Sequence, residues 1–232
     1  VISQPMYFPW VGMLEQLRMA DVYVHLDDAQ FSKGGFFNRV QVKTGPGTSW
    51  LTVPLEKKKL GQSLNEIRPT ARDWRSKHLA TLSQAYAAAT HSEAAIALAE
   101  SVLDAEHGSL ASLSAVSMEA LADYFGILPP VIHWASRMDR GEIGTDRVLA
   151  ICRALGADRY VTGHGARAYL DHAAFDAEGI RVEYMEYEKR EYSQLHGTFT
   201  PYVSALDLVA NAGPEGQEVI ASGSVYWKDF LS

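Results

Sequence analysis

The sequence predicts an α/β fold with a mostly parallel, Rossmann-like sheet, into which a β-hairpin and a three-helix segment are inserted. Apolar and other side chains alternate over residues 22–26, which is the period of a pleated strand. A strand-like start at residues 1–4 and a helical repeat of apolar residues at 10–20 precede it, which makes a βαβ unit with parallel strands. Strands and helices alternate again from Val131 onward. The sheet is therefore expected to be covered on both faces.

Residues 40–53 predict the hairpin, because two strand-like runs flank a Gly-Pro-Gly turn. Residues 70–126 predict three helices from the spacing of their apolar side chains, and Gly126 ends the third. We expect residues 1–69 and 127–232 to form one α/β core domain, with the three helices as an insertion.

The α/β pattern resumes after the helices. Thr145 is a candidate N-cap of the next helix, and Asp146 in its first turn would be favoured by the helix dipole. Strands are predicted at residues 131–134, 160–162 and 180–184, and helices at residues 145–155 and 204–211.

The composition restricts the class of protein. The chain has 232 residues, of which 47% are hydrophobic, enough for a sizeable core. Its net charge of -7 argues against a nucleic-acid-binding protein, which needs a basic surface. Cys152 is the one cysteine, so neither an internal disulfide nor a cysteine-based metal site can form. With no apolar run of about 18 residues and no basic leader before the first strand, we expect a cytoplasmic protein without a membrane partner.

Polar residues crowd together directly after the buried strand at 22–26. Ligands of open α/β sheets collect outside the carboxyl ends of the strands, so a site is expected here. Three phenylalanines lie among the polar residues, and an aromatic cluster of this kind usually covers something. An edge hairpin whose charges pair on a wet surface is the alternative. The polar residues are Asp27, Asp28, Gln30, Lys33, Asn38 and Arg39.

The acidic and basic members of this group suit amine chemistry. Neighbouring residues of an extended chain point to opposite faces, so Asp27 and Asp28 are not expected to share one ligand. One of them would pair with Lys33 or Arg39 and hold the loop, and the other would act as a base or bind an amine. The fork of Arg39 suits a planar carboxylate or a phosphate. Purely structural pairing of these charges is the competing interpretation.

The turn QPMYFPWVG joins the first strand to the first helix, where nucleotidyltransferases of the H-x-G-H type bind their nucleotide. When that motif is laid on residues 10–13, Gly12 matches and both histidines are missing. The imidazoles that would stabilise a phosphoryl transition state are therefore lacking. The similarity concerns the fold alone, and adenylyl transfer by that chemistry is not expected.

A second glycine-rich turn, GHGARAYL, follows the strand predicted at 160–162. Gly163 and Gly165 leave backbone N–H groups pointing outward at the head of a short helix, which makes a modest anion site. His164 between them is a candidate general base, but a lone histidine between glycines is more often incidental. Cys152 lies among apolar residues of the preceding helix, so we interpret it as part of the core and not as a nucleophile.

Several phrases of the chain together resemble the WbqC-like protein family. They are QPMYFPWVG, DDAQFSKGGFFNR, LTVPL, ICRALGA, GHGARAYL and FTPYVSALDLVANAG, and they cover nearly the whole chain. The family is found among bacterial O-antigen and related biosynthetic genes, and transfer of glycine or a similar acyl group onto an amino sugar has been suggested for it. The alanine-rich, arginine-containing helices suggest a high-GC bacterium, where such a protein would serve antibiotic biosynthesis instead of a surface polysaccharide.

The resemblance carries motif residues over position by position. The family pattern has a proline or another small residue between Gly163 and Gly165, so a role for His164 is not inherited from it. The matching positions are Gln4, Pro5, Tyr7, Phe8, Pro9, Gly12, Asp27, Asp28, Gln30, Phe31, Lys33, Gly34, Asn38, Arg39, Asp207, Asn211 and Gly213.

These observations together predict a transferase that moves an acyl or aminoacyl group from an activated donor onto a small-molecule amine such as an amino sugar. The donor would be nucleotide-activated, held on a carrier protein or attached to tRNA, and the negative charge counts against tRNA. No metal and no cofactor is expected. The predicted catalytic residues are Asp27, Asp28, Lys33 and His164. The predicted substrate-binding residues are Gln4, Tyr7, Gln30, Asn38, Arg39, Gly163, Gly165 and Asn211.

In this hypothesis different residues of the loop have different roles in catalysis. The amides of Gln30 and Asn38 would donate to the developing oxyanion, while Lys33 and Arg39 would hold a carboxylate, a phosphate or a carrier arm. The sequence leaves open which aspartate is the functional one. Two other functions stay open: a non-catalytic binding module for a nucleotide-sugar or a carrier-bound intermediate, and a degenerate nucleotidyltransferase.

Overall fold

Three parallel strands lie at the centre of the fold. The computed structural model describes residues 1–57, 59, 61–71, 73–138, 141 and 143–232. The strands β1 (Ile2–Ser3), β2 (Val22–His25) and β5 (Val131–Trp134) form one sheet in the order β1-β2-β5, and both strand pairs are parallel. The predicted βαβ start is confirmed, with α1 (Val11–Arg18) as its helix. The structure is a mixed α/β fold, as the sequence predicts.

A second sheet lies beside the first. It contains the parallel strands β6 (Arg159–Thr162) and β7 (Arg181–Met185), and β8 (Ser224–Tyr226) is antiparallel to β7. Strand β6 is next to β1, and the Tyr160 hydroxyl donates a long hydrogen bond to the Ile2 carbonyl at 3.5 Å. The amino ends of β1, β2 and β6 line one cavity together, so the three strands begin at the same edge. Their carboxyl ends lie at the opposite edge.

The predicted hairpin is confirmed as β3 (Arg39–Thr44) and β4 (Gly47–Thr52). A two-residue turn joins the strands. Val40 and Leu51, which are opposite each other in the register, are buried on one face. Trp50 lies on the other face and is 43% exposed. The hairpin therefore contributes one face to the core and leaves an aromatic side chain at the surface.

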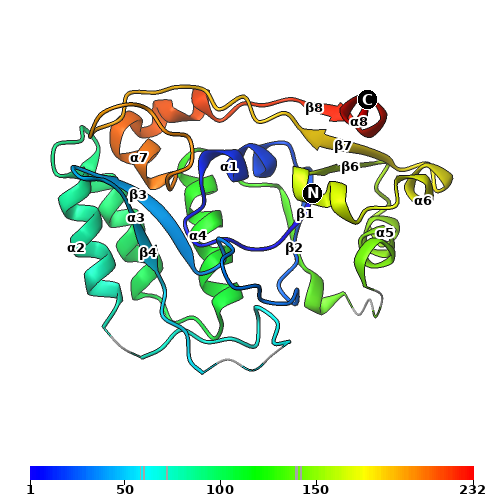
Figure 1. The fold of residues 1–232 in the computed structure, drawn as a ribbon, viewed down its shortest axis with the longest axis horizontal. Coiled ribbons are helices and arrows are strands. Elements are labelled where there is room, and N and C mark those ends of the chain that lie inside the picture. The colour runs from blue at the N-terminus through cyan, green and yellow to red at the C-terminus, as the bar shows by residue number, and fades with distance from the viewer. Residues whose placement is uncertain (58, 60, 72, 139–140, 142) are drawn as a thin grey trace.

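The three predicted helices are α2 (Arg75–Tyr86), α3 (Ser92–Asp104) and α4 (Leu110–Tyr124). Gly126 follows α4 with a φ of 64°, the left-handed position at which glycine ends a helix. Figure 1 shows α2 and α3 beside the hairpin at one end of the molecule, with β6 and β7 at the other. The helices share one apolar core with α1, the hairpin and α7 (Leu206–Ala212). The division of the chain into a core domain and an insertion stays a prediction.

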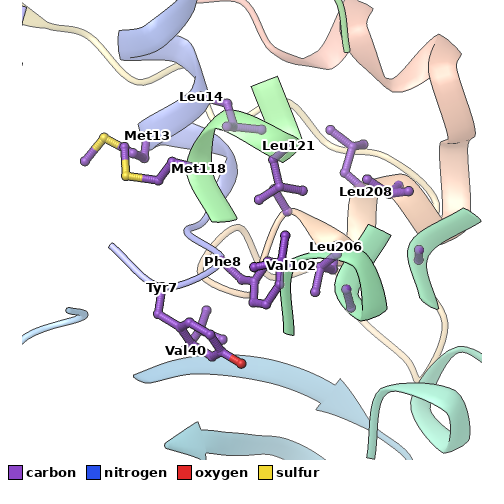
Figure 2. Packing of buried hydrophobic residues seen from close by; sticks show 14 of the residues in the cluster. Tyr7, Phe8, Met13, Leu14, Val40, Val102, Met118, Leu121, Leu206 and Leu208 are labelled. Carbon is purple, nitrogen blue, oxygen red and sulfur yellow. The ribbon is translucent and has the colours of Figure 1, made fainter. Parts of the chain in front are cut away.

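Helix α4 holds both the turn after β1 and the loop after β2. The Ser117 hydroxyl accepts a hydrogen bond from the Phe8 N–H at 2.8 Å, and the Ser114 hydroxyl donates to the Phe37 carbonyl at 2.8 Å. Both serines are buried. Phe8 has a φ of 39°, an uncommon value for a residue with a side chain, and it is held there by its surroundings. Figure 2 shows the Phe8 ring beside Val102 of α3.

A second apolar cluster packs β6 and β7 against α5 (Gly144–Ala154) and α6 (His172–Ala177). The prediction that Thr145 caps α5 is wrong, because the helix begins at Gly144 with Ile143 at the N-cap position. The Thr145 hydroxyl instead donates to the Tyr169 carbonyl at 3.0 Å, a contact with a distant segment that replaces the local cap.

A long segment without helix or strand, which we call the strap, follows β7 and consists of residues 186–203. It runs across α1 toward α7, and the chain then returns through η3 (Gly213–Val219) to β8 and α8 (Trp227–Leu231) (Figure 1). Tyr187 and Lys189 of the strap have positive φ values of 50° and 52°. The strap therefore covers a helix that belongs to the first βαβ unit.

Short 3-10 helices follow two of the parallel strands at the carboxyl edge. They are η1 (Ala135–Arg137) after β5 and η2 (His164–Ala168) after β6. Across the described residues, no helix combines the length and the apolar character needed to cross a membrane.

Candidate functional site

The turn after β1 and the loop after β2 lie against each other at the carboxyl edge of the parallel strands. The Leu26 N–H donates to the Ser3 carbonyl at 2.8 Å, and the Tyr7 N–H donates to the Phe36 carbonyl at 3.3 Å. The two segments that carry most of the predicted site residues are therefore neighbours. The chemistry they can perform depends on which of their side chains have internal partners.

Asp27 is buried and bonded at both carboxylate oxygens. One oxygen accepts from the Ser136 N–H at 3.0 Å, and the other accepts from the Ser136 hydroxyl at 2.6 Å and from the Asn65 amide at 3.5 Å. Ser136 belongs to η1, so this carboxylate ties the end of β2 to the end of β5. Its geometry is that of a structural acceptor.

Asp28 points to a different partner. It forms a short ion pair with Arg147 of α5, and the two side chains are 26% and 18% exposed. The Arg147 guanidinium also lies 3.5 Å from the Ala135 carbonyl. The two neighbouring aspartates therefore do not share a ligand, which agrees with the expectation from the sequence. Asp28 keeps some contact with solvent at the carboxyl edge.

Asn38 and Arg39 bind backbone groups of their own loop and hairpin. The Asn38 amide donates to the Val53 carbonyl at 2.9 Å. The Arg39 guanidinium donates to the Gly34 carbonyl at 2.5 Å and lies over the Trp50 ring, 4.3 Å from its centroid. Gln30 and Lys33, in contrast, are exposed. The loop after β2 thus presents an ammonium group and an amide to solvent.

Tyr7 lies in the core, whereas Gln4 is half-buried. The Tyr7 hydroxyl is 2.9 Å from Nδ1 of His78 in α2. Burial lowers the pKa of His78 to about 4, so its ring is neutral near pH 7 and can accept this hydrogen bond. The structure therefore gives Tyr7 an internal partner, and Gln4 is the polar side chain of this turn with more access to solvent.

The second glycine-rich turn lies at the end of β6. A side chain at Gly163 would come within 2.8 Å of the Tyr187 hydroxyl and 2.9 Å of the Gln16 amide, so these two side-chain ends would have to move to make room for it. Nε2 of His164 lies 2.5 Å from the Met185 carbonyl, to which it donates, and the ring packs against Tyr187. His164 therefore has a structural partner on β7. Gly165 beside it is exposed.

Asn211 lies in a different part of the molecule. Its amide donates to the Asp207 carbonyl at 2.8 Å, and its carbonyl accepts from the Leu195 N–H at 3.3 Å. These bonds join α7 to the strap. Figure 1 places α7 near α2 and α3, away from β6.

A histidine–carboxylate pair that sequence reasoning missed lies at the carboxyl end of β2. Nε2 of His25 is 2.9 Å from a carboxylate oxygen of Glu119 in α4. The His25 side chain is fully buried, whereas that of Glu119 is 32% exposed. Nδ1 of His25 is also buried and has no hydrogen-bond partner among the residues that the structure describes. The His25 ring packs against the rings of Tyr23 and Trp134, with centroid-to-centroid distances of 5.0 and 5.1 Å.

The His25–Glu119 pair has the geometry of an oriented imidazole. In the neutral imidazole, an Nε2–H that donates to the carboxylate leaves Nδ1 without a proton, and Nδ1 can then act as a proton acceptor. The available signal in the sequence is a histidine at the end of an apolar strand, directly before Leu26 and the two aspartates. Glu119 gives no such signal, because it comes from a helix distant in the sequence.

Comparison with known proteins identifies the family. The model of the WbqC-like protein family matches residues 4–219. The chain belongs to this family. An uncharacterised protein of Mycobacterium tuberculosis is 34% identical to it over 223 residues, which make up 94% of this chain and 96% of the relative. No solved structure matches the chain.

This WbqC-like chain buries two further reactive side chains away from the His25–Glu119 pair. Burial raises the pKa of the Cys152 thiol to about 11, which agrees with its interpretation as part of the core. Glu15 of α1 is 1% exposed, and its Oε2 has no hydrogen-bond partner among the described residues. Burial raises the pKa of Glu15 to about 7, and the neighbouring Ser222 hydroxyl partly offsets the shift.

Glu15→Gln is expected to stabilise this WbqC-like protein at pH 8 by about 2 kcal/mol and to have little effect at pH 4. The pKa of Glu15 is higher in the folded chain than in the unfolded chain, so folding is penalised once pH rises past the unfolded value, and the penalty is complete above pH 7. Urea denaturation of both proteins at the two pH values measures the difference. The same difference at pH 4 and pH 8 would contradict the prediction.

Proposed function

We propose that the chain is a transferase that moves an acyl or aminoacyl group from an activated donor onto an amine. The observation that carries the proposal is the His25–Glu119 pair at the carboxyl end of β2. An amine must lose a proton when it attacks a carbonyl, and an imidazole oriented by a carboxylate is well suited to accept it. Glu119 is a positioning residue in this scheme, because it acts through His25.

The reaction balances with these groups alone. The amine nitrogen attacks the carbonyl carbon of the donor, and the new C–N bond forms. His25 accepts the amine proton at Nδ1 and gives it to the leaving group as the bond between the carbonyl carbon and that group breaks. Because the ring is fully buried, the side chains packed over it must rearrange when substrates bind.

The arrangement of strands supports a ligand at this edge. Strand β1 has β2 on one side and β6 on the other, so the chain order reverses at β1. In open α/β sheets, ligands bind outside the carboxyl ends of the strands at such a point. The segments that follow β1, β2, β5 and β6 would then surround the substrates. The transfer of glycine suggested for the WbqC-like family is the same class of reaction.

The loop after β2 would bind the donor, as predicted from the sequence. Lys33 would bind its phosphate or carboxylate, and Gln30 would donate from its amide. Asp28, paired with Arg147, would hold the edge of the site. The acceptor would be an amino sugar and the location the cytoplasm, in the biosynthesis of O-antigen or of an antibiotic.

Incubation with three donors tests the proposal. The donors are glycyl-tRNA, a glycyl thioester on a phosphopantetheine carrier protein, and glycine with ATP, each with a nucleoside diphosphate amino sugar as acceptor. Mass spectrometry is expected to detect the glycyl amide of the sugar with one donor. Absence of the amide in all three mixtures would refute the transferase.

Lys33→Ala is expected to raise the KM for the donor about tenfold and to leave kcat nearly unchanged, because an exposed ammonium group binds an anion without taking part in proton transfer. Steady-state kinetics with the productive donor measures both constants. Lys77→Ala removes another exposed lysine, on α2, and serves as the control. Equal effects of the two substitutions would remove Lys33 from the donor site.

A non-catalytic binding module is the second candidate. It is favoured by the internal partners of Asp27, Asn38 and Arg39, which leave few polar side chains of the loop for chemistry. Calorimetry separates the two functions: binding of the amino sugar or the donor without product in any mixture would favour the module.

A further inference from the structure

Two large aromatic side chains lie exposed together beside the loop after β2. Phe36 of the loop and Trp50 of β4 are 45% and 43% exposed, and their ring centroids are 5.9 Å apart at an interplanar angle of 33°. Single exposed aromatic residues are normal at a protein surface, whereas neighbouring rings form an apolar patch. The Arg39 guanidinium lies over the Trp50 ring, 4.3 Å from its centroid. We call Phe36, Arg39 and Trp50 the aromatic platform.

The platform occupies one end of the outer face of the hairpin. Arg39 and Lys43 of β3 lie on this face together with Trp50 of β4. The strap covers the other end, where the buried Lys43 ammonium donates to the Gln194 amide oxygen at 3.1 Å and to the Gly197 carbonyl at 2.9 Å. At the end nearest the loop after β2 the rings stay exposed, so a ligand can reach them without a movement of the strap.

The charged groups of the loop that remain available beside the platform are cations. Arg39 makes one hydrogen bond with the described residues, to the Gly34 carbonyl at 2.5 Å, and a guanidinium has five N–H donors. Lys33, which precedes Gly34, is exposed and has no ion pair within the described ranges. The two aspartates of the loop are bonded away from the platform, to Ser136 and Arg147. The charge of this surface is therefore complementary to an anion.

A nucleoside diphosphate combines the two features that this surface complements. Its base is a flat π system, which stacks on aromatic rings and on guanidinium groups. Its phosphates accept hydrogen bonds from lysine and arginine. Lys33 is next to the residue that Arg39 binds, so its flexible side chain can reach the phosphates of a nucleotide whose base lies on the rings. An inorganic anion would leave the rings unused, and a neutral sugar would leave the cations unpaired.

We propose that the aromatic platform binds the base of a nucleoside diphosphate, whose phosphates bind to Lys33 and to the Nη groups of Arg39. This inference rests on the proposed function, because it names the anion that Lys33 would hold there. The nucleotide has two possible sources, which share this chemistry. It belongs either to a donor activated by ATP or to the nucleoside diphosphate amino sugar that accepts the acyl group.

Isothermal titration calorimetry with ADP, UDP and pyrophosphate tests the proposal, at constant ionic strength and without divalent metal ions. ADP represents the activated donor, UDP represents the sugar acceptor, and pyrophosphate carries the charges without a base. At least one nucleotide is expected to bind about tenfold more tightly than pyrophosphate, because one stacked base contributes about this much. The nucleotide that binds more tightly identifies the source. If neither bound more tightly than pyrophosphate, the proposal would be overturned.

Variants of the platform make the test specific. Trp50→Leu should weaken nucleotide binding about tenfold and leave pyrophosphate binding within about twofold, because it removes the ring and keeps the charges. Trp50→Phe keeps a π face and should lose about threefold or less. Tyr169→Leu removes a side chain after η2 that is 52% exposed, and it serves as the control. Wild-type nucleotide affinity in Trp50→Leu would overturn the proposal.

The fold of each variant is checked by its thermal midpoint. Trp50 is on the exposed face of the hairpin, so its replacement should leave the core intact. If Trp50→Leu did not fold, Phe36→Leu would make the same comparison, with an expected loss of about threefold in nucleotide affinity. Unchanged affinity in that variant would also overturn the proposal.

These measurements separate the platform from the transfer reaction. Binding is measured without an acyl group or an amine, so a chain that transfers nothing can still bind a nucleotide. Conversely, a glycyl amide formed from the carrier-bound donor would support the transferase even if no nucleotide bound to the platform. Failure of one proposal can therefore be told from failure of the other.

Discussion

Replacement of His25 by glutamine is expected to lower kcat by about 10² to 10⁴-fold with little change in the KM values. Glutamine is close to histidine in size and can still donate to Glu119, so the packing between β2 and α4 should survive. It cannot accept the amine proton. Steady-state kinetics with the donor and acceptor that yield product measures the effect, and the thermal midpoint shows whether the fold is intact.

Two further variants define what the histidine does. His133→Gln changes a half-buried histidine on the neighbouring strand β5 and should leave kcat unchanged. Glu119→Gln should lower kcat about tenfold, because the ring stays in place but its tautomer is no longer set by a carboxylate. If His25→Gln retained wild-type turnover in a folded protein, His25 would have no part in the reaction.

Asp27→Ala is expected to reduce the free energy of unfolding by about 3 kcal/mol. The carboxylate accepts from the Ser136 N–H, the Ser136 hydroxyl and the Asn65 amide, and its removal leaves these donors without their partner in a buried place. Urea denaturation followed by tryptophan fluorescence measures the loss.

Asp28→Ala is the matched control for this prediction. Its ion pair with Arg147 is partly exposed, so the expected loss is about 1 kcal/mol or less. If the adjacent substitutions cost the same, the hydrogen bonds of Asp27 do not hold β2 to β5 in the way described above. A large loss for Asp27 alone would assign this residue to the fold and leave Asp28 as the aspartate available for function.

The parts of the fold that could be predicted have local signals. The alternation at residues 22–26 and the two-residue turn between β3 and β4 are each formed by residues that are close together in the sequence. The same is true of the end of α4, which Gly126 marks. The N-cap of α5 could not be predicted in the same way. The Thr145 hydroxyl donates a hydrogen bond to the Tyr169 carbonyl, and no residue near Thr145 in the sequence indicates that partner.

The sequence predicted the location of the candidate site, but not which of its side chains have internal partners. The turn after β1 and the loop after β2 meet, because both follow parallel strands at one edge. Whether a side chain of the site has an internal hydrogen-bond partner depends on residues that are distant in the sequence. Asp27 bonds to Ser136, and His25 bonds to Glu119. The strand pattern shows His25 only as one residue of an alternating run. Its proposed role depends on the partner that α4 supplies, and no local pattern predicts how α4 packs against the strand.

The hydroxyls of Ser114 and Ser117 have a consequence for anyone who wants a smaller version of this protein. A shortened chain that joins residue 69 directly to residue 127 would keep every parallel strand but lose the groups that hold Phe8 and Phe37. It would also uncover Leu14 of α1 and Val40 of the hairpin, which pack in the core that the helices complete. Deletions should therefore be made elsewhere in the chain. Without these helices an apolar face of the remaining fold would be exposed to solvent, and the shortened protein would be expected to aggregate.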